Sequence, residues 1–279
     1  MSAYWQLLRP KQWIKNIFVV PPIIFSGRFL ENDAVIDLGL AVLLFCLCAS
    51  IAYIVNDIHD LEQDRTHPKK SKTRALASGR VTVKQAILVA IILTLTVFTT
   101  AFIVNAKLGL VLLAYLLLTI AYTYSLKNFP IVDLFTIASG FVLRMYAGAV
   151  AIEVPLSDWM FITGFTLALY LAAIKRKQEL CSGNLQRPVL KLYSETLVQR
   201  YAEMSATGAL VFYSLYVVTE NSKLVLTIPL VLFGLFRYWY VVETHNAGES
   251  PADAFFQDWL LSSTVVLWAI ISMVVLWPK

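Results

Sequence analysis

Charged residues are scarce in this chain, since Asp, Glu, Lys and Arg together make up only 15% of its 279 residues. That scarcity, with 58% apolar residues and a mean hydropathy of +0.69, excludes an ordinary soluble globular domain. Cysteine is also rare: Cys46 and Cys48 would face different sides of a helix, and Cys181 follows in a distant loop. These three predict neither a disulfide framework nor a metal site. With no internal repeat and no low-complexity linker, residues 1–279 are expected to form a single domain.

Long apolar stretches dominate the rest of the chain, and several approach the ~20 residues that a helix needs to cross a bilayer. They predict an all-α, polytopic membrane protein with about nine transmembrane helices. The expected spans are residues 13–29, 34–58, 85–106, 108–126, 131–152, 159–174, 197–218, 224–242 and 259–278.

Lys and Arg are distributed unevenly over the predicted loops, with 17 on the N-terminal side of the membrane and 4 on the opposite side. The positive-inside rule then predicts a multi-pass protein of the inner (plasma) membrane with a cytoplasmic N-terminus and an outward C-terminus. Because charges precede the first apolar run, no cleavable signal peptide is expected. The net charge of +5 arises from these loops, so it suits a membrane surface rather than nucleic acid. No oligomeric state is predicted.

Three aspartates lie at the end of the second predicted span and directly after it. On a continuous helix Asp57 and Asp64 lie about 20° apart, and Asp60 lies about 60° from Asp57. Carboxylates on one helix face repel one another unless a cation lies between them. Hard oxygen ligands suit Mg²⁺, whose shell is usually completed by waters and substrate phosphates. The motif therefore predicts a magnesium site, formed by these three aspartates, in a membrane enzyme that handles a diphosphate.

The loop after the aspartates is basic and includes Lys70 and Arg74. A positive-inside loop beside a capped helix end explains these cations, but it does not explain three acids at a membrane boundary. Basic residues beside carboxylates also suit a metal–phosphate site, where they neutralise the remaining phosphate oxygens.

A second cluster on the same side contains Tyr122, Tyr124, Lys127 and Asp133. Tyr122 fits an interfacial aromatic belt, whereas Lys127 fits a membrane anchor and a phosphate contact equally well. Asp133 begins the fifth span and has no comparable structural explanation. Arg144 lies about three turns deeper, where an unpaired guanidinium is costly, so it must face the protein interior and an anion.

The sixth span ends in a third cluster, where Lys175 and Glu179 share a helix face and Arg176 follows Lys175. A positive-inside anchor with a helical ion pair explains this cluster, and so does a phosphate-binding pocket. Near the N-terminus, Lys15 belongs to a basic and aromatic segment that fits an interfacial anchor or a contact with a lipid phosphate. All three clusters lie at cytoplasmic ends of spans, which favours a common site.

The aspartate motif resembles the first aspartate motif of the UbiA superfamily of intramembrane prenyltransferases, through Asn56, Asp57, Asp60, Asp64, His67, Pro68, Lys70 and Arg74. Most members carry a second aspartate motif at the end of the sixth span, but here that position reads Lys175-Arg176-Lys177-Gln178-Glu179-Leu180. This segment looks like the decaprenyl-phosphate phosphoribosyltransferase branch, which residues 9–16, 124–127 and 144–148 also resemble. Arg74-Ala75 departs from the family's usual Arg-Pro.

The resemblance implies a UbiA-type bundle that transfers the 5-phosphoribosyl group of phosphoribosyl diphosphate (PRPP) to a polyprenyl (decaprenyl-type) phosphate. Diphosphate would leave, Mg²⁺ would be required, and the anomeric carbon would be inverted. The acceptor phosphate is already an anion, so no general base is needed. The implied catalytic residues are Asp57, Asp60, Asp64, Lys127 and Asp133, and the implied substrate-binding residues are Asn56, Lys15, Lys70, Arg74, Tyr124, Arg144, Lys175, Arg176 and Glu179.

Two other functions remain open. Prenyl transfer from a prenyl diphosphate to an aromatic or other acceptor is the first, and the missing second aspartate motif argues against it. The second is a transporter or lipid-binding protein without catalysis. This alternative would be favoured if the aspartates of the motif proved dispensable for function. PRPP carries a 5-phosphate as well as a diphosphate, so one acidic metal site and one basic pocket suit it better than two acidic sites.

Overall fold

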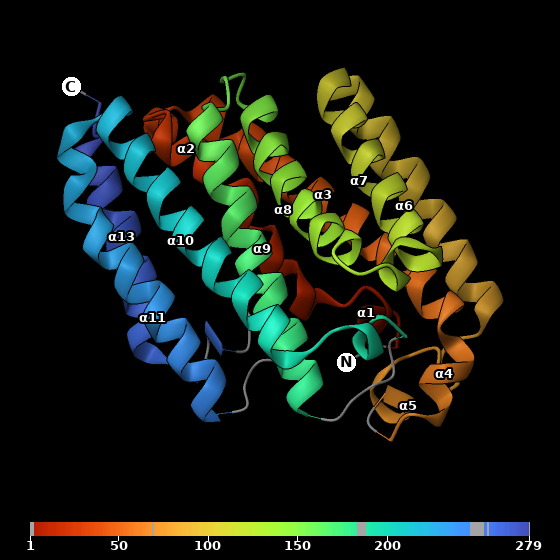
Figure 1. The fold of residues 1–279 in the computed structure, drawn as a ribbon. Coiled ribbons are helices and arrows are strands. Elements are labelled where there is room, and N and C mark those ends of the chain that lie inside the picture. The colour runs from red at the N-terminus through yellow and green to blue at the C-terminus, as the bar shows by residue number, and fades with distance from the viewer. Residues whose placement is uncertain (1–2, 69, 183–187, 246–253, 256, 279) are drawn as a thin grey trace.

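A computed structural model describes residues 3–68, 70–182, 188–245, 254–255 and 257–278, and every regular element within them is a helix (Figure 1). The α-helices are α1 (Ala3–Leu7), α2 (Pro21–Phe25), α3 (Asn32–His59), α4 (Leu61–Thr66), α5 (Lys70–Thr73), α6 (Val83–Val104), α7 (Ala106–Tyr124), α8 (Val132–Ala151), α9 (Asp158–Cys181), α10 (Glu195–Glu220), α11 (Ile228–His245) and α13 (Trp259–Val275). The 3₁₀ helices are η1 (Pro10–Val19), η2 (Arg28–Leu30), η3 (Leu126–Asn128), η4 (Pro188–Leu192) and η5 (Ser222–Thr227). The expected all-α fold is therefore confirmed.

Six segments of the described chain are helical, long and apolar enough to cross a membrane: α3, α6, α7, α8, α9 and the combined η5–α11 segment. Each coincides with an apolar stretch in the sequence, because a bilayer requires uncharged helices of about this length. The longest, α3, has 28 residues and so extends about 42 Å. Two further helices, α10 with 26 residues and α13 with 17, pack against α9 and α11 respectively.

The first expected span, residues 13–29, is not one continuous α-helix. Instead η1 and α2 meet at Val20, because Pro21 and Pro22 lack backbone donors and are favoured at a helix start. Close packing holds η1 in place, since a Cβ at Gly148 of α8 would overlap the carbonyl oxygen of Val19. The N-terminal segment therefore enters the bundle as two short helices.

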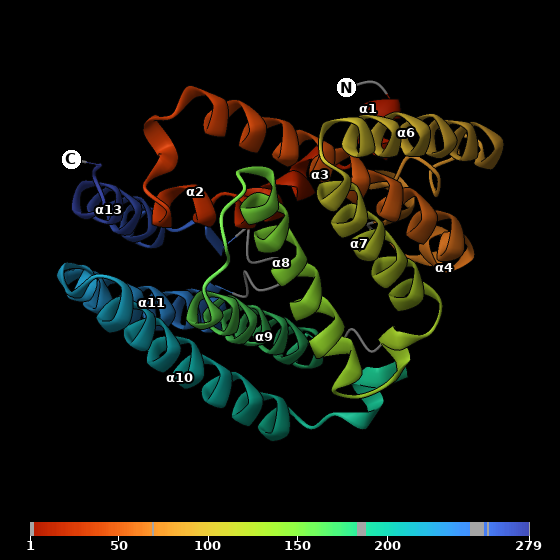
Figure 2. The same cartoon turned by 90° about the horizontal axis from the view of Figure 1, so that it is seen from above.

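The long helices lie side by side with roughly aligned axes (Figures 1 and 2). The central helix is α8, which packs against α3, α7, α9 and η1. Three short helices, α1, α4 and α5, gather at one end of the bundle (Figure 1), and the C-terminal end of α9 lies at the same end. The basic loops assigned by their charge to one side of the membrane are thus brought together.

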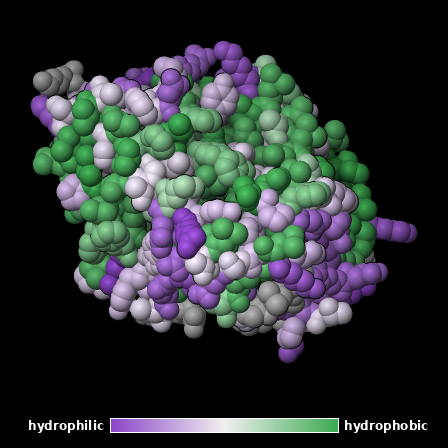
Figure 3. Space-filling view, viewed as in Figure 1, coloured by the Kyte–Doolittle hydropathy of each residue, from purple (hydrophilic) through white to green (hydrophobic). Residues whose placement is uncertain are grey.

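On the face seen in Figure 3, apolar side chains cover much of the bundle, whereas hydrophilic side chains are densest at the end with α4 and α5. On α6, for example, Leu95 is 64% exposed and Ile103 is 79% exposed. Soluble monomers rarely present such broad apolar surfaces to water, whereas lipid chains are as apolar as Leu itself. This surface is that of a multi-pass integral membrane protein.

The arginine within α11 has a carboxylate partner. Arg237 donates to the two carboxylate oxygens of Asp258, at 3.0 and 2.7 Å. Asp258 also accepts a hydrogen bond of 2.8 Å from the backbone nitrogen of Leu261. One carboxylate therefore neutralises a cation of α11 and caps α13, which explains how this span accommodates a charge.

Candidate functional site

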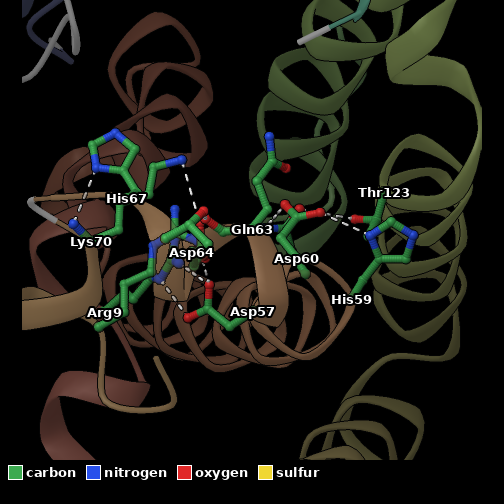
Figure 4. A network of polar contacts seen from close by, with 12 residues as sticks. Arg9, Asp57, His59, Asp60, Gln63, Asp64, His67, Lys70 and Thr123 are labelled. Carbon is green, nitrogen blue, oxygen red and sulfur yellow. Dashed lines mark hydrogen bonds and ion pairs between the residues drawn. The ribbon is translucent and has the colours of Figure 1, made fainter. Parts of the chain in front are cut away.

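A break in the helix divides the aspartate motif. The helix α3 ends at His59, Asp60 adopts φ −90° and ψ 9°, and α4 begins at Leu61. The continuous helix expected from the sequence is therefore wrong, and the three carboxylates do not share one face. Figure 4 shows Asp57 and Asp64 together on one side of the break and Asp60 on the other.

Asp57 and Asp64 form a buried pair, 3% and 2% exposed, that is held by three cations. Nη1 of Arg74 lies 3.1 Å from Asp57 Oδ1 and also contacts Asp64 Oδ2. Arg9 Nε donates to Asp57 at 3.0 Å, and Lys70 Nζ lies 3.4 Å from Asp64. Buried carboxylates are tolerated only with such compensation. Burial and the nearby charge of Arg9 lower the pKa of Arg74, outweighing both carboxylates.

Asp60 has a separate set of partners. Lys127 Nζ of η3 lies 2.9 Å from Asp60 Oδ1, and His59 Nδ1 lies 2.8 Å from the same oxygen. The other oxygen accepts from the amide of Asn56 at 3.1 Å. Partial burial raises the pKa of Asp60, but the bonds from His59 and Lys127 outweigh it, so the net shift is downward. This carboxylate is therefore held in its charged form.

Arg176 is the centre of a second buried network of polar contacts. Its side chain is 1% exposed, and its Nε donates to Asp133 Oδ2 at 2.7 Å. The remaining nitrogens donate to Glu179 at 2.7 Å and to the hydroxyl of Tyr122 at 2.9 Å. Asp133 also accepts from the hydroxyl of Tyr193 at 2.6 Å. The network ties α7, α8 and α9 to the segment after η4.

A cavity of about 860 Å³ opens at this end of the bundle. Asp60 and Glu179 are the acids among its described lining residues, which include no Leu, Ile, Val, Met or Phe. Cations predominate instead: Arg9, Lys11, Lys70, Lys72, Arg74, Arg80, Lys127 and Lys175. Such a wall attracts a polyanion and offers charge-assisted hydrogen bonds to several phosphate groups.

The cavity brings together half of the residues that the sequence analysis assigned to the site. Those of its lining are Asn56, Asp60, Lys70, Arg74, Lys127, Lys175 and Glu179. Asp57 and Asp64 lie behind Arg74, and Asp133 and Arg176 lie within the buried network. Lys15 is half-buried in η1 and does not line the cavity. Tyr124 is 59% exposed, and its ring packs edge-on against that of His59.

Arg144 lies in the core rather than at the cavity. It donates to the side-chain oxygen of Asn16, to the hydroxyl of Tyr115 and to the carbonyl of Gly140, at 2.8, 2.8 and 2.7 Å. The rings of Phe45 and Tyr115 also lie near its guanidinium. The anion expected from the sequence is therefore replaced by neutral acceptors and aromatic faces, which stabilise a buried cation.

Sequence reasoning did not reveal the roles of several residues of this site. Arg9 fits a membrane anchor in the sequence, yet it neutralises Asp57. Tyr122 fits an interfacial belt, yet it lines the cavity and accepts from Arg176. Two buried acids require cations nearby, and this requirement is the signal that could have indicated the role of Arg9. Nothing in the sequence indicates Tyr193.

The carboxylate oxygens at this position are ligands of the type that a divalent cation prefers. Oxygens of Asp57 and Asp64 converge on one nitrogen of Arg74, so two hard ligands already meet around a positive charge. One or two carboxylates, with waters and substrate phosphates, commonly hold Mg²⁺. Among the residues that the structure describes, no three His, Cys, Asp or Glu side chains converge, so Asp60 does not join the pair in this arrangement.

Comparisons with known proteins agree with this architecture. The profile of the UbiA prenyltransferase family matches residues 19–261. Decaprenyl-phosphate phosphoribosyltransferase from Mycobacterium tuberculosis is 32% identical over 274 residues, covering 94% of this chain and 90% of the relative. The protein of that name from Corynebacterium glutamicum is 30% identical, covering 94% and 82%. A solved UbiA homologue from Archaeoglobus fulgidus, bound to GPP and Mg²⁺, matches with a TM-score of 0.77 at 18% identity over 99% of both chains.

The family profile spans most of the sequence, and the solved homologue shares the helical fold over nearly its whole length. The chain is therefore an integral-membrane transferase that belongs to the UbiA prenyltransferase family.

Proposed function

We propose that this protein transfers the 5-phosphoribosyl group from PRPP to a polyprenyl phosphate, releases diphosphate and requires Mg²⁺. The observation that carries the proposal is the cavity wall, with eight Lys and Arg residues and no large aliphatic side chain among its described members. A prenyl diphosphate would place its hydrocarbon chain against charged groups. PRPP presents phosphates at both ends of a hydrophilic sugar. The names of the relatives from Mycobacterium and Corynebacterium support the same choice.

Two groups of cations in the cavity would contact the two ends of the donor, one its diphosphate and the other its 5-phosphate. Arg9, Lys70 and Arg74 adjoin the aspartate pair and would contact the diphosphate. Lys127 and Lys175 come from η3 and α9 and would contact the 5-phosphate. Holding the donor at both ends orients the anomeric carbon between them, which is the main way in which positioning lowers a barrier.

Asp57 and Asp64 would hold Mg²⁺, with Asp60 across the helix break. The metal would supply positive charge to the departing diphosphate. The surrounding cations of the chain would stabilise the same developing charge. The lipid phosphate is an anion near neutral pH, so no side chain has to remove a proton. Attack from the face opposite the diphosphate would invert the anomeric carbon.

Arg176 and Asp133 act in this proposal as positioning residues. All three Arg176 nitrogens already donate to protein oxygens, so the side chain orients Glu179 and Tyr122 rather than binding phosphate. Asp133 is fully buried behind it. Arg144 likewise has a complete set of protein partners and is assigned no substrate contact.

A transfer assay tests the proposal. Purified protein with Mg²⁺, labelled PRPP and a polyprenyl phosphate should produce a labelled lipid and release one diphosphate per transfer. The alternative is prenyl transfer, which the family name and the GPP-bound homologue favour. Prenylation of an aromatic acid by a prenyl diphosphate, without turnover of PRPP, would establish that alternative and refute the proposal.

Replacing Lys175 by Ala should raise the KM for PRPP by about 10-fold or more, since a charge-assisted hydrogen bond contributes ~1.5–3 kcal/mol. Lys177→Ala is the matched control, because Lys177 pairs with Glu243 at 2.5 Å and does not line the cavity. Steady-state kinetics and the amount of membrane-inserted protein are compared in both variants. A loss of insertion with an unchanged KM would make Lys175 a membrane anchor.

The proposed active site lies on the cytoplasmic side of the inner membrane, as the uneven distribution of Lys and Arg predicts. Cysteine placed at Ser71, in α5, should therefore resist a membrane-impermeant reagent in intact cells and react after permeabilisation. Cysteine placed at Lys107, at the start of α7, should react in both conditions. The native cysteines are replaced by serine beforehand. Modification of the Ser71 position in intact cells would reverse the topology.

A further inference from the structure

A single nitrogen of Arg74 lies between the two buried carboxylates. Nη1 contacts Asp64 and is 3.1 Å from Asp57, so both carboxylates face the same point. Arg74 lines the cavity, whereas Asp57 and Asp64 are nearly inaccessible behind it. A cation that enters from the cavity and binds both carboxylates must therefore take the place of this nitrogen.

The local balance of charge leads to the same conclusion. Arg9 and Lys70 also contact these carboxylates, so three positive charges already face two negative ones. A divalent ion added to this group would be repelled unless one of the cations moved away. Arg74 is the one that bridges both acids. Its backbone follows α5 in the stretch of turns before α6, outside the long helices.

We propose that Arg74 is an exchangeable occupant of the metal position: the divalent ion displaces its guanidinium from Asp57 and Asp64, and the guanidinium then binds the donor's diphosphate. The inference rests on the proposed function, because it takes the aspartate pair as the metal site and a diphosphate as the arriving anion. The planar guanidinium suits the exchange, since its fork of donors matches carboxylate and phosphate equally well.

The exchange couples metal binding to donor binding. Without metal, Arg74 neutralises two acids that would be costly to bury unpaired. With metal, the displaced guanidinium needs an anion, and the diphosphate supplies it inside the cavity. Each ligand therefore favours the other, as a coupling between two sites requires. Arg74 thus has opposite effects on the two ligands: it competes with the metal and assists the diphosphate.

Metal and anion binding to the full-length protein in detergent test this inference. Mn²⁺ replaces Mg²⁺, because electron paramagnetic resonance measures free Mn²⁺ directly, and inorganic diphosphate is titrated as its Mn²⁺ complex by calorimetry. Arg74→Ala should tighten Mn²⁺ binding by about 10-fold and weaken binding of the Mn²⁺–diphosphate complex by about 10-fold. Arg74→Gln, which keeps length and loses charge, should shift both affinities in the same directions.

Arg65→Ala is the matched control, because it removes one positive charge from the same loop while Arg65 is exposed and outside the cavity lining. It should change either affinity by less than about threefold, as expected of a screened surface charge. Mn²⁺ binding that is unchanged or weaker in both Arg74 variants would refute the exchange and leave the metal site intact. Absence of Mn²⁺ binding to the wild type, with and without diphosphate, would refute the exchange and the proposed metal site together.

Discussion

Replacing Asp64 by Asn should reduce PRPP turnover by at least about 100-fold, because groups around a catalytic metal commonly contribute 10–100-fold even when they do not bind it directly. Asn keeps the shape of the side chain but removes the charge that pairs with Arg74 and Lys70. Asp57→Asn should have the same effect. The measurement is the initial rate over a series of Mg²⁺ concentrations, and high Mg²⁺ should restore only part of the rate.

Glu62→Gln is the control for this series, since Glu62 is an exposed acid on α4 and has no place in the cavity wall. It should retain nearly the full rate. Asp60→Asn should also lose activity, although its carboxylate pairs with Lys127 on the other side of the helix break. Near-normal rates for Asp60→Asn and Asp64→Asn at every Mg²⁺ concentration would contradict the metal assignment.

Replacing Arg176 should mainly lower the stability of the protein. Arg176→Met leaves Asp133 charged and fully buried, with Tyr193 as its remaining side-chain partner among the residues that the structure describes, and breaking a buried pair in this way costs about 3–5 kcal/mol. The apparent melting temperature in detergent should therefore fall steeply. Lys177→Met, which breaks a more exposed pair with Glu243, should cause a much smaller loss.

The double variant Arg176→Met with Asp133→Asn separates charge from packing. Removing both charges eliminates the unpaired anion, so the double variant should melt at a higher temperature than Arg176→Met alone. If Arg176→Met instead folded like the wild type and only raised the KM for PRPP, Arg176 would be a phosphate ligand and the network would be secondary.

The helices were predictable because a bilayer sets both their length and their lack of charge. Residues 85–106 and 108–126 coincide with α6 and α7 to within about two residues at each end, as expected of any boundary assignment. The N-terminal segment was not predictable in this way. Pro21 and Pro22 break its helical hydrogen bonding, and its 3₁₀ part is stabilised by packing on Gly148, which lies far along the chain.

The residue types of the site were predictable, but their pairing was not. Helical periodicity alone places Asp57, Asp60 and Asp64 on one face, and the break at Asp60 separates them. Arg176, the cationic partner of Asp133, is 43 residues away, so local spacing contains no information about this pair. Isolated charges in a membrane sequence indicate that partners exist, because an unpaired charge is costly there. Only the fold shows which partners they are.

Direct binding of two donors to the wild-type protein, without acceptor, tests the central claim most directly. Calorimetry in detergent with Mg²⁺ compares PRPP with geranyl diphosphate, two donors that share the diphosphate and differ in the group attached to it. PRPP should bind at least about 10-fold more tightly, because its 5-phosphate gains a further charge-assisted bond from the basic wall of the cavity. Equal or tighter binding of geranyl diphosphate would contradict the account.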